Sequence, residues 1–227
     1  MKLIHNFKSP NFNDRKSNNI EIIVIHYTAL SSISNSLKYL CSKKNKVSSH
    51  YLISQEGKIY SLVSEKKRAW HAGQSYWRGR TDINSISIGI ELDFSPSDIN
   101  NKFTLKLNSA LIFLLTKLLK KYRISNENIL GHSDIAPYRK IDPGKYFPWQ
   151  MLENKKLSYR PQFLNKSEIK NNVKKEWLHK NKLNSIKKKI LFMLNFIGYD
   201  ISLALKNKIY FDQLINAYSS HYRIYKN

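Results

Sequence analysis

The chain has 227 residues, of which 39 are Lys or Arg and 16 are Asp or Glu, so its formal net charge is +23. This length suits one large domain, or one mid-sized domain with a small companion, and a hydrophobic fraction of 41% is enough to build a core. The single Cys excludes an intramolecular disulfide framework and any zinc site built on two or four Cys ligands. If a metal ion is bound, His and carboxylate side chains must hold it.

The positive charge has two interpretations. It favours a polyanionic partner such as nucleic acid, an acidic membrane or an anionic polymer. Alternatively, Lys and Asn recur along the whole chain, and such a bias in composition spreads Lys over a solvated surface. No helix-turn-helix, zinc-finger or stacked-aromatic motif supports nucleic-acid binding, so we expect no nucleic-acid partner.

The N-terminal segment resembles no targeting signal. Residues 1–16 contain neither an apolar core region nor a small-residue cleavage site, the two marks of a signal peptide. No apolar run in the chain reaches the ~18–20 residues that a membrane-spanning helix needs. We therefore expect a cytoplasmic protein without an integral membrane segment, or a periplasmic one if a signal was removed. The oligomeric state is not predicted.

Strand and helix patterns alternate through the first half of the chain. Residues 20–26 form a continuous apolar, β-branched run that is typical of a buried strand, and residues 31–43 suit a short helix. Residues 51–54 and 58–63 flank a Glu-Gly turn and predict a β-hairpin. A loop rich in Trp, Gly and Arg then leads into another strand over residues 85–92.

The pattern continues up to Trp149. Residues 103–123 carry Leu at helical spacing with Lys on the opposite face, which predicts an amphipathic helix. Residues 129–132 predict a short strand, and the Pro- and Gly-marked segment after it is irregular. Strands and helices interleaved in this way predict an α/β fold, with one mixed central β-sheet flanked by helices.

The character of the chain changes after Trp149. Residues 153–182 are charged and are predicted to form a basic linker, whereas residues 183–227 show two helical stretches. About 45 residues are too few for a robust core of their own. We therefore predict a main domain over residues 1–152 and a small all-α module over residues 183–227.

Three polar side chains stand at or near the ends of apolar segments. His26 ends the first strand, His132 follows the apolar run Ile129-Leu130-Gly131, and Asp142 lies ten positions later in the chain. Two imidazoles and one carboxylate make an open three-ligand zinc site that leaves the fourth position for water. Spacing alone does not decide this, because a single His in a chain with seven is more often structural than a ligand.

Four motifs add a resemblance to a known family. IVIHYTA, VSSHYLISQEGKIYSLVSEKKRAWHAG, SIGIELDF and GHSDIAPYRKIDPGKYFPW follow one another in this order. Together they resemble the zinc-dependent N-acetylmuramoyl-L-alanine amidases of the amidase-2 family, relatives of the peptidoglycan recognition proteins. The resemblance covers roughly residues 10–152. It implies a mixed sheet with one zinc ion in a groove. The implied reaction is hydrolysis of the amide between the lactyl group of N-acetylmuramic acid and L-alanine, in peptidoglycan or muropeptides.

Position by position, the resemblance implies roles for individual residues. His26, His132 and Asp142 match the zinc ligands of the family. Glu91, in SIGIELDF, matches the general base beside the zinc water, and Lys140 matches the cation that faces the scissile carbonyl. The alternative for Glu91 and Lys140 is a solvated charge on the surface.

The loop after the hairpin resembles the wall of a substrate groove. Its candidate substrate-binding residues are Trp70, His71, Arg80 and Asn84. An aromatic plane suits the face of a sugar, and Arg80 could bind a stem-peptide carboxylate through a forked hydrogen bond. The alternative is that Trp70 belongs to the core and the loop is structural.

The C-terminal residues carry a second, weaker resemblance. Residues 183–227 look like a degenerate peptidoglycan-binding module of three short helices, of the kind found behind some of these amidases. The usual Gly-Asp turn is not evident, so a helical cap over the catalytic domain is the alternative. For the whole chain, the alternative to an amidase is a recognition protein that binds muropeptide without cleaving it. The complete ligand set, with Glu91 and Lys140, favours the enzyme.

Overall fold

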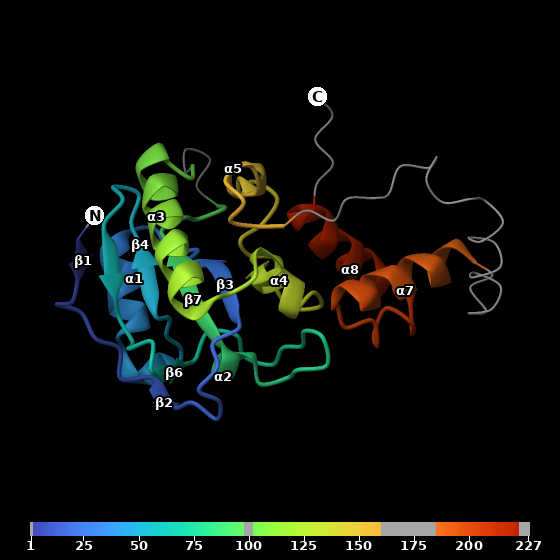
Figure 1. Cartoon of the computed structure of the whole chain (residues 1–227), viewed down its shortest axis with the longest axis horizontal. Coiled ribbons are helices and arrows are strands. Elements are labelled where there is room, and N and C mark those ends of the chain that lie inside the picture. The colour runs from blue at the N-terminus through green and yellow to red at the C-terminus, as the bar shows by residue number, and fades with distance from the viewer. Residues whose placement is uncertain (1, 98–101, 160–184, 223–227) are drawn as a thin grey trace.

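The computed structural model describes residues 2–97, 102–159 and 185–222. Its centre is a six-stranded sheet with the strand order β1-β5-β4-β7-β3-β8 (Figure 1). β7 and β8 flank β3 and run parallel to it, whereas β4 and β5 are antiparallel, so the prediction of a mixed sheet is confirmed. The strands are β1 (Leu3–Ile4), β3 (Ile22–Tyr27), β4 (Tyr51–Ile53), β5 (Ile59–Ser61), β7 (Ser87–Leu92) and β8 (Ile129–Gly131).

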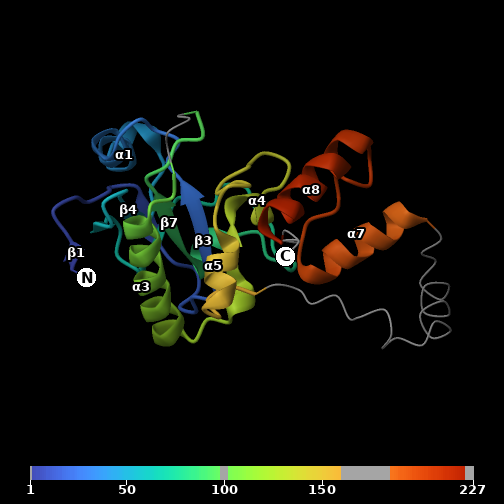
Figure 2. The ribbon, with the colours of Figure 1, turned by 90° about the horizontal axis from the view of Figure 1, so that it is seen from above.

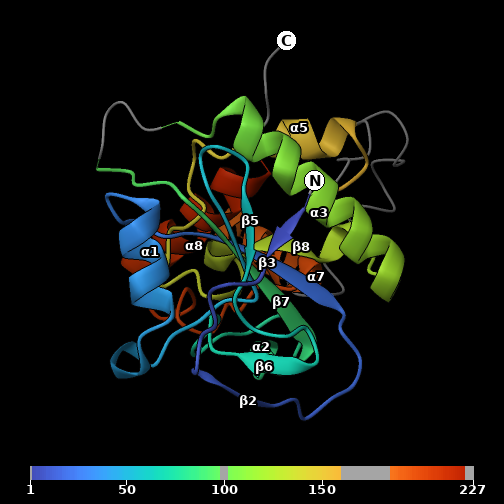
Figure 3. The same cartoon turned by 90° about the vertical axis from the view of Figure 1, so that its left-hand side faces the viewer.

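Helices cover both faces of this sheet. Figures 2 and 3 show α3 and α5 on one face and α1 on the other. The predicted helix over residues 103–123 is confirmed: α3 starts after Thr104, whose hydroxyl oxygen accepts a hydrogen bond from the Leu107 amide at 3.1 Å. The helices are α1 (Ile33–Leu40), α2 (Ile83–Ile86), α3 (Leu105–Tyr122), α4 (His132–Ile135), α5 (Trp149–Asn154), α7 (Ile186–Ile197) and α8 (Lys208–His221).

β3 separates two hydrophobic cores. Ile23 and Ile25 face the core that contains α3, and Ile22 and Val24 face a second core on the opposite side. Side chains alternate along a strand, so an apolar run without interruption means that both faces are covered. The buried strand predicted over residues 20–26 is therefore confirmed, and the structure shows that both of its faces are covered.

Several short elements were not predicted. β2 (Phe12–Asp14) pairs with β6 (Lys67–Ala69) in a small antiparallel sheet, and α2 and α4 are single turns in segments expected to be irregular. The β2–β6 pair joins segments more than 50 positions apart, and local residue patterns carry no signal of such pairing. Among the described residues, no helix combines the length and apolar character needed to cross a membrane.

The C-terminal helices share the second core with the main domain. Leu194 and Leu214, from α7 and α8, are buried in one cluster with Trp77 and Ile135. Figures 1 and 2 show the two helices beside α4, on the side of the molecule away from β1. The two predicted helical stretches are thus confirmed, and they cover apolar surface of the main domain.

The predicted boundary at residue 152 falls inside packed structure. α5 continues to Asn154, and Leu157, 8% exposed, belongs to the core around α3. The main domain therefore extends beyond the predicted start of the linker. Residues 160–182 of that linker lie outside the described residues, as do residues 183–184 and 223–227 of the predicted module.

Candidate metal centre

Three adjacent parallel strands bring polar side chains to one edge of the sheet. His26 lies one residue before the end of β3, and Glu91 lies beside it in register on β7. His132 follows the last residue of β8 on the other side of β3. The carboxyl ends of parallel strands are the usual position for ligand and catalytic groups, because a rigid sheet fixes the side chains there.

The three predicted metal ligands meet at this edge. Nδ1 of His26 lies 3.0 Å from Nδ1 of His132, and each of these atoms lies 3.1 Å from Oδ2 of Asp142. The residues are 2%, 4% and 7% exposed, in the same order. Two imidazole nitrogens and one carboxylate oxygen that converge in a buried site are a suitable donor set for a divalent cation such as zinc.

The surroundings of the site keep the two kinds of ligand in the forms that bind metal. Burial, assisted by the nearby His132, lowers the pKa of His26 to about 4, so this imidazole is neutral at pH 7. Burial alone would raise the pKa of Asp142. The adjacent His132 and His26 outweigh that effect and hold the Asp142 pKa well below its usual range, so this carboxyl group is ionised. Metal binding requires neutral imidazole and ionised carboxylate.

A chain of hydrogen bonds behind His26 sets its tautomer. The Ser87 hydroxyl lies 2.6 Å from the Ile83 carbonyl oxygen, to which it donates, and its oxygen is left to accept from Nε2 of His71 at 3.2 Å. Nδ1 of His71 is then the acceptor for Nε2–H of His26, at 3.1 Å. Because the proton of His26 is on Nε2, the lone pair of Nδ1 points into the ligand cluster.

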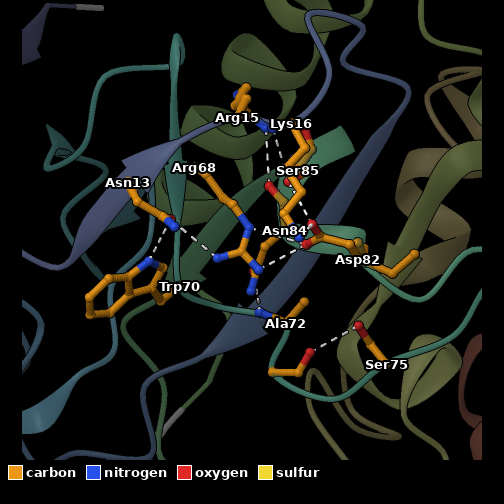
Figure 4. Close-up of polar contacts among 12 residues, drawn as sticks. Asn13, Arg15, Lys16, Arg68, Trp70, Ala72, Ser75, Asp82, Asn84 and Ser85 are labelled. Atoms are coloured by element: carbon orange, nitrogen blue, oxygen red, sulfur yellow. Dashed lines mark hydrogen bonds and ion pairs between the residues drawn. The ribbon is translucent and has the colours of Figure 1, made fainter.

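His132 is oriented by the residue next to His71. Its Nε2–H donates to the Ala72 carbonyl oxygen at 3.1 Å, which leaves the Nδ1 lone pair for the cluster. The side chain of Asn84 holds this segment, since its Oδ1 accepts from the backbone amides of His71 and Ala72 at 3.1 and 2.8 Å. Figure 4 shows Asn84 beside Ala72. One short segment, residues 71–72, therefore orients both histidines of the cluster.

Residues 71–72 and the residues that hold them are packed tightly. Arg15 donates to the backbone carbonyl oxygens of Asn84 and Ser85 at 3.1 and 2.9 Å, which fixes α2 to the N-terminal segment (Figure 4). Gly89 lies against the His71 ring, and a Cβ atom at this position would be 2.4 Å from Cγ of His71. Only glycine leaves room for the ring there.

The two predicted auxiliary residues lie beside the ligand cluster. Glu91 is 8% exposed, and within the described residues its Oε2 atom has no hydrogen-bond partner. Burial raises the pKa of Glu91 to about 8; the negative charge of Asp142 adds to this effect, and the positive charge of Lys140 opposes it. Lys140 is half-buried and follows α4 in the chain.

The four predicted substrate-binding residues do not form one wall. His71 and Asn84, each 5% exposed, lie beneath the surface and support the ligand histidines. Because both side chains are buried, neither can line the substrate groove that the sequence predicted. Trp70 is partly buried and donates from Nε1 to Asn13 at 2.9 Å, and Arg80 pairs with Glu21 at 3.3 Å.

A pocket of about 290 Å³ opens between α8 and the segment that carries His132 and Asp142. Ser133 and Lys140 line it on one side, and Gln213 and Ser220 of α8 line it on the other. The sequence did not predict a contribution from α8 to the surroundings of Lys140. Two helical turns separate Gln213 from Ser220, so they lie on one face of α8.

Residues 16–145 match the model of the Amidase_2 family, described as N-acetylmuramoyl-L-alanine amidase. The chain belongs to this family. The resemblance predicted from the four motifs is therefore confirmed, and the mixed α/β fold agrees with it.

Two curated relatives of this amidase-family chain illustrate the similarity. It is 40% identical over 164 residues to the N-acetylmuramoyl-L-alanine amidase AmiD of Escherichia coli, an alignment that spans 63% of this chain and 55% of AmiD. It is 35% identical over 162 residues to the 1,6-anhydro-N-acetylmuramyl-L-alanine amidase AmpD of Haemophilus influenzae, over 63% of this chain and 86% of AmpD. The chain thus matches little more than half the length of AmiD.

Solved structures of amidases extend the similarity beyond the main domain. AmiD from Escherichia coli, in complex with the substrate anhydro-N-acetylmuramic acid-L-Ala-D-gamma-Glu-L-Lys, has a TM-score of 0.73 at 31% identity, over 93% of this chain and 84% of AmiD. AmpDh3 from Pseudomonas aeruginosa, in complex with anhydromuramic pentapeptide, has a TM-score of 0.74 at 28% identity, over 96% and 89%. An AmpD structure covers 70% of this chain and 94% of its own length, at a TM-score of 0.58.

Proposed function

We propose that the chain is a zinc-dependent N-acetylmuramoyl-L-alanine amidase. It hydrolyses the amide bond between the lactyl group of N-acetylmuramic acid and L-alanine in peptidoglycan or muropeptides. The convergence of His26, His132 and Asp142, with Glu91 beside them, carries this proposal. Family membership supports it, as do the muramyl peptides bound in the AmiD and AmpDh3 structures.

His26, His132 and Asp142 would hold the zinc ion. When bound, zinc supplies a Lewis acid that makes water a stronger acid and polarises a carbonyl group. Three protein ligands leave room for a water molecule and substrate, which is the arrangement of catalytic rather than structural zinc sites. The His71 and Ala72 bonds keep both imidazoles in the tautomer that this role needs.

Glu91 acts as the general base in this proposal. Its free Oε2 atom takes the proton of the attacking water and later returns it to the amine of the departing L-alanine. A cation in the ligand cluster offsets the negative charge of Asp142, which is one cause of the raised Glu91 pKa, and so favours the ionised base. Lys140 stabilises the negative charge that develops on the carbonyl oxygen of the scissile amide.

Only two of the four candidate substrate-binding residues keep that role in this proposal. We retain Trp70 and Arg80 as candidate contacts with sugar and stem peptide, because both keep exposed surface. His71 and Asn84 are assigned to the support of the ligands. A recognition protein that binds without cleaving is not favoured, since such a protein needs neither a complete ligand set nor a desolvated carboxylate beside it.

The proposal is tested with His26→Ala in the full chain. The variant should lose bound zinc and should no longer release the L-Ala-headed peptide from anhydro-muropeptide or sacculi, measured by elemental analysis and mass spectrometry. His5→Ala, which changes an exposed histidine outside the cluster, is the matched control and should retain both. Turnover by metal-free His26→Ala would refute the proposed site.

A further inference from the structure

The C-terminal helices meet the ligand segment at one carboxylate. Asp134 is on α4, two residues after His132, and is 0% exposed. Its Oδ2 atom accepts from the backbone amide of Gly131 at 2.6 Å and from Nδ1 of His221 at 2.6 Å. Its Oδ1 atom accepts from the hydroxyl of Tyr199. Both side-chain donors thus come from the C-terminal region.

These donors are held firmly in place. The His221 ring stacks on Trp149, with centroids 3.6 Å apart, and on Tyr222, with centroids 3.9 Å apart. Tyr199 is 0% exposed and contacts Trp77 edge-to-face, at 5.2 Å between centroids. Aromatic contacts on both faces of His221 restrict rotation of its ring, so the N–H group that it offers to Asp134 has a fixed direction.

The turn that Asp134 stabilises joins two of the three proposed ligands. His132 lies between Gly131, whose amide binds Asp134, and Ser133, whose amide donates to the carbonyl oxygen of Asp142 at 2.9 Å. Gly131 also packs closely on the residue after Asp142, since a Cβ atom there would be 2.6 Å from the Pro143 ring. A displacement of Asp134 would therefore move His132 and Asp142 together.

We propose that the two C-terminal helices are a structural part of the metal centre. Tyr199 and His221 fix Asp134, and Asp134 fixes the turn that presents His132 and Asp142. Tyr199, His221 and Asp134 are positioning residues that contact neither substrate nor metal. This inference rests on the proposed metal-dependent function, and it goes further by giving residues 185–222 a role in that centre besides any binding of the cell wall.

Loss of either hydrogen bond should loosen the metal site while the packing is kept. Tyr199→Phe removes only the hydroxyl that donates to Asp134, and His221→Phe keeps an aromatic ring at this position but removes the donating N–H group. In the full chain, the double variant should bind zinc about 10- to 100-fold more weakly in competition with a chelator, the usual effect of losing an outer-shell partner. The visible absorption spectrum of the Co²⁺-loaded protein should change, and activity should return at saturating zinc.

The matched control is Tyr138→Phe. The Tyr138 hydroxyl donates to the Asp200 carbonyl oxygen at 2.6 Å, so this variant loses a hydrogen bond to the same C-terminal region without touching Asp134. Its zinc affinity and Co²⁺ spectrum should match those of the unmodified protein.

The outcomes separate this inference from the proposed function. If the unmodified chain binds neither zinc nor Co²⁺, the proposed function fails. If it binds and hydrolyses, but the double variant keeps the same affinity and spectrum, only the role of the C-terminal helices is refuted. Should the double variant not fold, the single Tyr199→Phe, which removes one oxygen atom, is measured in the same way and decides the question.

Discussion

Each clustered histidine has one ring nitrogen in the cluster and the other bonded to the protein. His26 donates to His71, and His132 donates to the Ala72 carbonyl oxygen. Both lone pairs therefore point at the position where Asp142 places its carboxylate oxygen. Glu91 differs from these three because its Oε2 atom is buried without a partner among the described residues, and that makes it the group most able to exchange a proton.

Glu91→Gln should separate metal binding from turnover. Gln has nearly the same shape and cannot accept a proton, so zinc content should be unchanged while kcat falls by about 10²- to 10⁴-fold, the usual contribution of a general base. Zinc analysis and steady-state kinetics on anhydro-muropeptide check this. A rate close to that of the unmodified protein would remove Glu91 from the mechanism.

The same variant should change the pH dependence of stability in the metal-free protein. The folded-state pKa of Glu91, about 8, lies above its ordinary value of 4.5, so between these pH values the folded chain holds a proton that the unfolded chain releases. This contribution to the free energy of unfolding is fully present below about pH 4.5 and is lost as the pH rises towards 8. Denaturant unfolding at pH 5 and pH 8 should show a smaller loss for Glu91→Gln. Equal losses would contradict the raised pKa.

At the scale of elements, the support of the metal centre comes from segments that are distant in the chain. α2 contributes Asn84, β7 contributes Ser87 and Gly89, and the segment after β6 contributes His71 and Ala72. Of these, only His71 and Asn84 were singled out in the sequence, and for contact with substrate. Burial and hydrogen bonding place them behind the ligands, and neither property could be inferred from a motif in a loop.

Gly89→Ala should disturb the metal centre without touching a ligand. The new Cβ would lie 2.4 Å from Cγ of His71, so the ring must move and His26 loses its hydrogen-bond partner. We expect a lower melting temperature and zinc affinity reduced about 10- to 100-fold. A double-mutant cycle with His71→Ala is the control: without the ring, the added Cβ should cost much less. Equal effects of Gly89→Ala in both backgrounds would show that the ring is not the cause.

At the scale of the molecule, the two C-terminal helices close the second core. They cover Trp77 and Ile135 and bring Tyr199 and His221 to Asp134. Without these helices, solvent would reach those apolar side chains.

A chain that ends at residue 159 should therefore be unstable. Exposure of Trp77 and Ile135 creates an apolar patch, and Asp134 loses two hydrogen-bond donors. Thermal unfolding and light scattering should show a lower melting temperature and aggregation. If the shortened chain is monomeric, equally stable and impaired only in binding to sacculi, the helices are a separate binding module.

Local residue patterns were sufficient for the main elements and for the candidate ligands. The apolar run of β3, the helical spacing of α3 and the hairpin of β4 and β5 all follow from side-chain periodicity, which is a property of short segments. His26 and His132 lie at strand ends and Asp142 lies in a motif close behind, so compact motifs marked all three candidate ligands. The sequence thus pointed to the family and to a candidate ligand set.

The surroundings of those ligands required the folded chain. The β2–β6 pair, the donor chain through His71 and Ser87, and the contact of His221 with Asp134 join residues between 16 and 87 positions apart. A hydrogen bond between distant segments depends on where packing brings them, and neither composition nor periodicity encodes that position. The net charge of +23 gave no hint that the decisive polar groups are buried ones.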